Sequence, residues 1–223
     1  DIEAISRVVH EAGKILIVDQ AHGAHLSLFG KYSSGSMPPA AEDCGADIVV
    51  NSTHKTLLSF TQSAVLNVIS DSVDLLRLED RLQAVESTSP SYILMASLDI
   101  NADILSAHGR EIIGSWDEAI DHFYKKAPDI RGLKVMAVPG HIDRAKLNID
   151  MSGAGLTGAE LEELLMGYGI FSELTTGNIL MCMTGAGNTL SDTERLLEAL
   201  EEISEKQQKA GKTAARCVAV SEK

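Results

Sequence analysis

The sequence predicts an α/β protein, with part of a mainly parallel sheet in residues 1–127, a small α+β domain in residues 128–210 and a flexible tail in residues 211–223. Two observations support this fold class. The apolar run at residues 15–18 and the mostly apolar segment at 46–50 each follow a helical pattern that ends at a glycine, which is typical of strands buried in a parallel sheet. Beyond residue 127 the order changes to pairs of strands separated by helices, which favours a second, α+β domain.

In the first domain, apolar residues at helical spacing predict a helix over residues 2–12 that ends at Gly13. A helix capped by Asp71 or Ser72 is expected to run to residue 84, after the third strand. The remaining elements expected here are a strand at 15–18, a short helix at 39–44 ended by Gly45, strands at 46–50 and 64–69, a turn at 87–91 and a long helix at 92–126.

The second domain is expected to begin after a linker at residues 127–132. Thr157 and Glu160 match a capping box, so a helix is expected over residues 157–168. Met181 and Met183 alternate as the core residues of a strand do, and Cys182 between them needs no reactive role. The other elements expected are strands at 134–138, 146–151, 170–174 and 179–184 and a helix at 192–208.

Composition excludes several classes of protein. The 223 residues include 44% apolar residues, enough for a buried core, and no apolar run approaches the roughly 20 residues of a membrane span. With 32 acidic and 19 basic residues the net charge is −13, which disfavours nucleic acid as a partner and favours cationic amines. The cysteines Cys44, Cys182 and Cys217 form no CxxC pair, so we expect neither a zinc site nor a disulfide framework, and a reducing cytoplasm is the expected location.

Polar residues follow both apolar runs, where open α/β sheets bind their ligands. Asp19 ends the first run, and Lys55 lies five residues after the second. A lysine can form a Schiff base with pyridoxal phosphate, and an acid can keep the pyridine nitrogen of that cofactor protonated. Ser52 and His54 are plausible donors to the phosphate, and the small Ala21 would let the cofactor ring lie flat.

Other interpretations of these residues are available. Taken singly, Lys55 is more often a solvated lysine, and an aspartate such as Asp19 is often a cap or turn residue. His22 and His25 with Asp19 suggest a metal site, but no further acid or thiol lies at ligand spacing, so this interpretation is rejected.

The residues around these positions resemble a known family. The segments at 18–25 (VDQAHGAH), 45–50 (GADIVV), 52–57 (STHKTL), 61–62 (TQ) and 88–99 (TSPSYILMASLD) look like those of the ornithine/lysine/arginine decarboxylases, with further matches in the second domain at residues 153–160 and 169–173. The resemblance implies the pyridoxal phosphate-dependent transferase fold of type I, of which this chain supplies the second half of the large domain and the small C-terminal domain.

The resemblance also implies an activity, the decarboxylation of a basic amino acid to its amine, and roles for individual residues. Lys55, Asp19 and His22 are the implied catalytic residues. Lys55 carries the cofactor, Asp19 pairs with the pyridine nitrogen, Ala21 packs on the ring, and Ser52 and His54 bind phosphate. Thr88 and Ser89 would reach the cofactor of a neighbouring subunit, which implies a homodimer, and Glu173 would meet the cationic end of the substrate.

Two departures from the family pattern matter. Gln20 stands where the family usually has Glu, so a local charge is lost. The phosphate-binding loop and the group that stacks on the ring belong to an upstream half that precedes Asp1 in the family, so we expect a fragment whose partner is that half as a second chain. A type I aminotransferase or lyase, and an inactive structural fragment, are the alternative functions.

Overall fold

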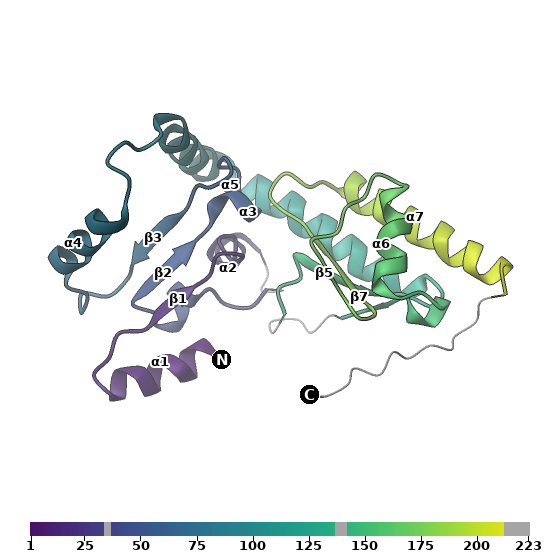
Figure 1. Cartoon of the computed structure of the whole chain (residues 1–223), viewed down its shortest axis with the longest axis horizontal. Helices are drawn as coiled ribbons and strands as arrows, with labels where there is room; N and C mark the ends of the chain where they lie inside the picture. Colours follow the sequence, from purple (N-terminus) through teal and green to yellow (C-terminus); the bar gives the residue numbers. More distant parts are fainter. Residues whose placement is uncertain (34–36, 137–141, 212–223) are drawn as a thin grey trace. The chain divides into compact units, whose positions relative to one another are not determined.

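The computed structural model describes residues 1–33, 37–136 and 142–211, which form two compact units that divide between Ile113 and Gly114 (Figure 1). Each unit contains one β-sheet. Two sequence predictions reach beyond the described residues: most of the tail at 211–223, and the end of the strand expected at 134–138.

The sheet of the first unit has the order β1 (Ile17–Asp19), β2 (Ile48–Asn51) and β3 (Val65–Val68). β1 and β2 are parallel, as the sequence predicts, with Asp19 paired to Val50. β3 runs antiparallel to β2. The carboxyl ends of β1 and β2 therefore lie side by side at one end of this sheet, and β3 starts from that end.

β2 is buried, but β1 is not buried on both faces as its sequence predicts. Ile17 in β1 is 62% exposed, and Ile15 just before the strand is 44% exposed. In the described part of the chain only β2 pairs with β1, so the other edge of β1 is open. An apolar strand at an open edge is a template for pairing with another strand.

Helix α1 (Ile2–Glu11) and the 3-10 helix η1 (Ala41–Cys44) pack with one face of this sheet. Asp1 caps α1 by accepting a hydrogen bond from the Ala4 amide at 3.1 Å, and Gly13 follows the helix with φ +64°. Ala41, Ala46 and Val49 form a buried cluster, against which Ile2, Leu16 and Val18 pack.

Three further helices complete the first unit or lead out of it. α4 (Leu75–Val85) begins two or three residues later than expected, because Asp74 and not Asp71 or Ser72 caps it by accepting from the Arg77 amide at 3.0 Å. α5 (Tyr92–Lys126) has the predicted bounds. α2 (Leu26–Tyr32) was not predicted. No helix in the three described ranges is both long and apolar enough to span a membrane.

The sheet of the second unit is antiparallel, in the order β4 (Lys134–Val135), β5 (Lys146–Asp150), β7 (Ile179–Met183) and β6 (Leu174–Thr176). Alternate residues of β5 and β7 are buried, namely Leu147, Ile149, Leu180 and Cys182. The expectation that Met181 and Met183 form the core of β7 is wrong, because they alternate with the buried residues and point to the other face of the sheet.

The helices α6 (Gly158–Met166) and α7 (Leu190–Lys209) share a core with this sheet. The predicted capping box of α6 is present: the Thr157 hydroxyl accepts from the Glu160 amide, and the Glu160 carboxylate accepts from the Thr157 amide at 2.8 Å. The two units divide inside α5, at Ile113 and Gly114, whereas the sequence analysis places the domain boundary at residue 127. The reason is that Phe123 and Ala127 belong to the core of the second unit.

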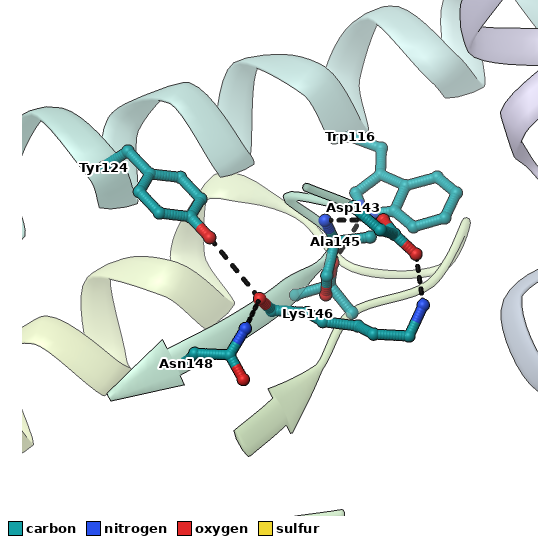
Figure 2. A network of polar contacts seen from close by, with 7 residues as sticks. Trp116, Tyr124, Asp143, Ala145, Lys146 and Asn148 are labelled. Atoms are coloured by element: carbon teal, nitrogen blue, oxygen red, sulfur yellow. Dashed lines mark hydrogen bonds and ion pairs between the residues drawn. The ribbon is translucent and has the colours of Figure 1, made fainter. Parts of the chain in front are cut away.

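Polar contacts tie the second half of α5 to the sheet of the second unit (Figure 2). The indole of Trp116, which is fully buried, donates from Nε1 to Thr184 Oγ1 at 2.8 Å, and this hydroxyl donates to the Ala145 carbonyl at 3.0 Å. Lys146 Nζ pairs with Asp143, whose other oxygen accepts from the Ala145 amide. The Tyr124 hydroxyl lies 3.4 Å from the Lys146 carbonyl, and burial raises the pKa of Tyr124 to about 12.

Replacing Thr184 by Val is expected to lower the free energy of unfolding of the second unit by about 1–3 kcal/mol, because the buried hydrogen bond from Trp116 Nε1 to the Thr184 hydroxyl is lost while the shape of residue 184 is kept. Chemical denaturation followed by Trp116 fluorescence measures this loss. Thr184→Ser, which keeps the hydroxyl, is the matched control. A Val variant as stable as the Ser variant would contradict the role given to this hydrogen bond.

Candidate functional site

The candidate site lies at the end of the first sheet where the carboxyl ends of β1 and β2 lie side by side. Asp19 is the last residue of β1, and its neighbour Val50 is followed by Asn51 and Ser52. The Gln20 amide donates to the Val50 carbonyl at 2.9 Å, so the pairing extends one residue beyond Asp19. The parallel register thus places the carboxylate of β1 beside the segment that leads to Lys55.

Asp19 presents an exposed carboxylate. Its Oδ1 atom accepts a hydrogen bond from the Ala21 amide at 3.0 Å, which turns the chain directly after the strand. The Gly23 amide closes the same turn on the Gln20 carbonyl at 2.8 Å, and His22 lies half-buried within it. Asp19 is therefore anchored through one oxygen and can accept a further hydrogen bond.

Lys55 lies on α3 (Thr53–Thr56), a single turn of helix that follows β2 and was not predicted. Ser52 precedes this helix, and its hydroxyl makes no capping bond. Lys55 is half-buried, and it forms no ion pair within the part of the chain that the structure describes. An amine without a structural partner is available for a ligand.

His54 points back onto the loop after α3. Its Nδ1 atom lies 2.8 Å from the Ser63 carbonyl. Because a carbonyl oxygen only accepts, Nδ1 carries the hydrogen, and Nε2 is left to meet another group. His54 is thus oriented by its own chain, and its role in binding the phosphate stays a prediction.

Buried polar side chains hold the loop that follows Lys55. The hydroxyls of Thr53 and Ser59 lie 2.6 Å apart. On α5, Asn101 accepts from the Leu58 amide at 3.0 Å, and Ser97 accepts from the Phe60 amide at 3.2 Å. These bonds satisfy the polar groups of a buried loop and fix the position of α3 against α5.

Some of the predicted site residues do not lie at the carboxyl ends of β1 and β2. Thr88 and Ser89 lie in the exposed segment between α4 and α5, and no described bond joins them to Asp19 or Lys55. Glu173 lies in the second unit, where its amide donates to the Met181 carbonyl at 2.9 Å. His25, which the rejected metal interpretation used, is fully buried with its ring edge-on to Phe29. The described residues contain no group of three or more metal-ligating side chains.

A pair of interacting side chains that the sequence did not predict lies at the opposite end of the sheet. His10 Nε2 on α1 lies 2.8 Å from Asp47 Oδ2, and the Leu16 amide donates to the same oxygen at 2.7 Å. The Asp47 side chain is only 4% exposed. Burial by itself raises the pKa of Asp47, but hydrogen bonds from His10, Leu16 and Ser70 together lower it below its ordinary value.

Because the pKa of Asp47 is lowered in the folded state, its contribution to stability is present above the unfolded pKa of about 3.9 and is lost as the pH falls through the folded value. Asp47→Asn is expected to cost about 1–3 kcal/mol near neutral pH, and the difference between variant and wild type should shrink as the pH falls below about 4. Urea unfolding at pH 7 and at pH 3 measures this. A difference that is the same at both pH values would contradict the assignment.

Comparison with known proteins identifies the family. The model of a family described as "Orn/Lys/Arg decarboxylase, major domain" matches residues 1–146, which include Asp19, Lys55 and the whole first unit. The chain belongs to the Orn/Lys/Arg decarboxylase family. The resemblance found in the sequence is thereby confirmed.

The curated relatives of this chain are about 30% identical to it in sequence. It is 30% identical to an arginine decarboxylase of Bacillus subtilis over 213 residues, which cover 92% of this chain and 42% of the relative. An arginine decarboxylase of Bacillus cereus is 29% identical over 215 residues, covering 92% and 45%. The chain therefore spans less than half the length of these relatives.

Solved structures show the same fold at lower identity. A lysine decarboxylase of Francisella novicida superposes with a TM-score of 0.69 at 20% identity, covering 87% of this chain and 33% of that one. A ureidoglycine-glyoxylate aminotransferase of Bacillus subtilis gives 0.67 at 15% identity, covering 93% and 57%. The predicted fold class, the C-terminal part of a type I pyridoxal phosphate enzyme, is confirmed.

The Orn/Lys/Arg decarboxylases use pyridoxal 5'-phosphate, so family membership confirms the expected cofactor. The described residues fit it chemically. Asp19 supplies a carboxylate for the pyridine nitrogen, and Lys55 supplies an amine that forms no ion pair among the described residues. Ser52 offers the phosphate a hydroxyl that caps no helix, and His54 offers an oriented imidazole, which donates from Nε2 when both ring nitrogens carry hydrogen.

Proposed function

We propose that this chain is the cofactor-binding part of a pyridoxal phosphate-dependent decarboxylase that converts a basic amino acid to its amine. The observation that carries the proposal is the parallel pairing of β1 and β2, which sets Asp19 beside the segment that leads to Lys55. The curated relatives named arginine decarboxylase support a basic substrate.

Each proposed role follows from the chemistry of the residue. Lys55 would supply the amine that holds the cofactor covalently. Asp19, held by the Ala21 amide, keeps a proton on the pyridine nitrogen through charge pairing. When bound, the cofactor withdraws electrons from the substrate α-carbon so that the bond to the carboxylate can break.

The remaining roles position the reactants. Ser52 and His54 are proposed to bind the phosphate, Ala21 to lie against the ring, and His22 to be a further catalytic residue. Glu173 on the second unit is proposed to bind the distal cationic group of the substrate, and the acidic net charge of −13 attracts such cations. Thr88 and Ser89 are proposed to reach the cofactor of a second subunit in a homodimer.

A companion segment, meaning a polypeptide that completes the sheet of the first unit, is proposed as a further requirement. Three strands with an open β1 edge and the exposed Ile15 and Ile17 support it.

We also propose a cytoplasmic location. Cys44 and Cys182 are buried free thiols, and burial raises the pKa of both, to about 11 for Cys182, so neither is poised for oxidation.

An assay of product chemistry tests this function. The chain co-expressed with its companion segment is loaded with pyridoxal phosphate and incubated with arginine, lysine or ornithine. Mass spectrometry follows the amine, and a coupled assay follows carbon dioxide. We expect stoichiometric amine and carbon dioxide from one of the three. A keto acid without carbon dioxide would indicate an aminotransferase, and no product from any of them would contradict the proposal.

A further inference from the structure

Glu42 on η1 collects hydrogen bonds from side chains at all three strands of the first sheet. Its Oε2 atom accepts from Gln20 Nε2 at 2.9 Å, and its Oε1 atom accepts from Asn51 Nδ2 at 2.7 Å and Asn67 Nδ2 at 3.3 Å. Gln20 directly follows β1, Asn51 ends β2 and Asn67 lies in β3. One carboxylate thus joins three strands, and we name these four residues the Glu42 network.

The hydrogen-bond partners determine the chemical type required at position 20. The Ala41 amide can only donate, and it lies 2.8 Å from Gln20 Oε1, so the side-chain oxygen must face η1. Gln20 Nε2 then donates to the Glu42 carboxylate and, at 3.1 Å, to Asn51 Oδ1. Position 20 must therefore accept on one side and donate on the other, which an amide does and a carboxylate does not.

The Glu42 network lies on the face of the first sheet opposite to the proposed catalytic residues. Side chains alternate along a strand, so Gln20 and Asn51 point to the face of the sheet opposite to Asp19 and Ser52. In the sequence, Gln20 separates Asp19 from Ala21, and Asn51 directly precedes Ser52. Bonds to the ionised Glu42 are charge-assisted and partly buried, which makes them stronger than exposed neutral ones.

Resting on the proposed function, we infer that Gln20, Glu42 and Asn51 are positioning residues that hold the ends of β1 and β2 in the spacing that Asp19 and Lys55 need for the cofactor. The inference also accounts for the departure at position 20. A glutamate there would put two carboxylates within hydrogen-bond distance, where like charges repel. The amide at position 20 and the carboxylate at position 42 therefore form a matched pair.

Gly23 packs against the Gln20 side chain and gives a second way to disturb the pair. A Cβ atom built on Gly23 would lie 2.6 Å from Gln20 Cγ and 3.0 Å from Leu26 Cδ1. Gly23→Ala must therefore displace the Gln20 side chain without changing any charge. Such a shift would lengthen the bonds from Gln20 to Glu42 and Ala41.

A charge exchange tests the inference in the chain co-expressed with its companion segment. We compare Gln20→Glu, Glu42→Gln, the double variant that exchanges the two, and Gln83→Glu, which adds the same charge on the exposed face of α4. The readouts are the Kd of pyridoxal phosphate from its visible absorbance and the melting temperature of the cofactor-free protein. Each single variant, and Gly23→Ala, should bind the cofactor at least about tenfold more weakly.

The double variant should recover part of that loss, because the amide at position 42 can donate to the carboxylate at position 20, whereas Asn51 Oδ1 still lacks the donor that Gln20 gave it. Gln83→Glu should bind as the wild type does. Losses that simply add in the double variant would overturn the inference. So would a coupled change in melting temperature with an unchanged Kd, since it would show a role in stability alone. Failure of the wild type to attach the cofactor through Lys55 would instead refute the proposed function itself.

Discussion

Asp19→Asn is expected to lower turnover by about two to three orders of magnitude while Lys55 still attaches the cofactor. The asparagine keeps the size of the side chain and can still accept from the Ala21 amide, so the turn after β1 should persist. It cannot pair as an anion with the pyridine nitrogen, so that nitrogen is no longer held protonated. Steady-state kinetics measure the loss, and absorbance confirms that the cofactor is present.

Asp103→Asn is the matched control for this experiment. Asp103 is exposed on α5, so the same change of charge should leave turnover unaltered there. An Asp19→Asn variant that turns over at nearly the wild-type rate would show that Asp19 is not the partner of the pyridine nitrogen. A variant without bound cofactor would place Asp19 in cofactor affinity rather than in the chemical step.

Residues 1–223 expressed alone are expected to aggregate or to bind pyridoxal phosphate at least about tenfold more weakly than the same chain co-expressed with the companion segment. The first sheet has three strands, and Ile17 at its open edge is 62% exposed. An apolar edge strand pairs with other chains when its proper neighbour is missing. Size-exclusion chromatography and cofactor titration of both preparations measure the difference.

The matched variant in that experiment is Ile17→Lys, which places a charge on the open edge of β1. It should make the isolated chain more soluble and should impair assembly with the companion segment. A monodisperse wild-type chain with a sharp thermal transition and full cofactor occupancy would contradict the requirement for a companion segment.

Local signals predicted much of the fold. The bounds of α5 follow from its uninterrupted helical pattern between a serine-proline turn and Pro128, and the capping box of α6 follows from four consecutive residues. α3 was missed because a single turn of helix leaves no periodicity to detect. The faces of β7 were exchanged because both sets of alternating residues in Ile179–Met183 are apolar, so that only packing against α6 and α7 distinguishes them.

The site divides in the same way. Asp19 and Lys55 were predicted because each follows a recognisable strand, and the pairing of β1 with β2 then places the ends of these strands together. The Glu42 network was not predicted, since its hydrogen-bonded pairs are 9 to 31 residues apart and meet only once three strands and η1 have assembled. Polar residues that meet through tertiary structure leave no spacing signal in the sequence.

Reduction of the cofactor-loaded protein with borohydride, followed by peptide mass spectrometry, tests the central claim most directly. The reduction fixes any cofactor attached through a lysine, so the modified peptide identifies the lysine used. We expect a single pyridoxyl group, on Lys55, and no labelling in the Lys55→Ala variant. A label on Lys31 or Lys146 instead of Lys55 would contradict the assignment of the cofactor site to the carboxyl ends of β1 and β2.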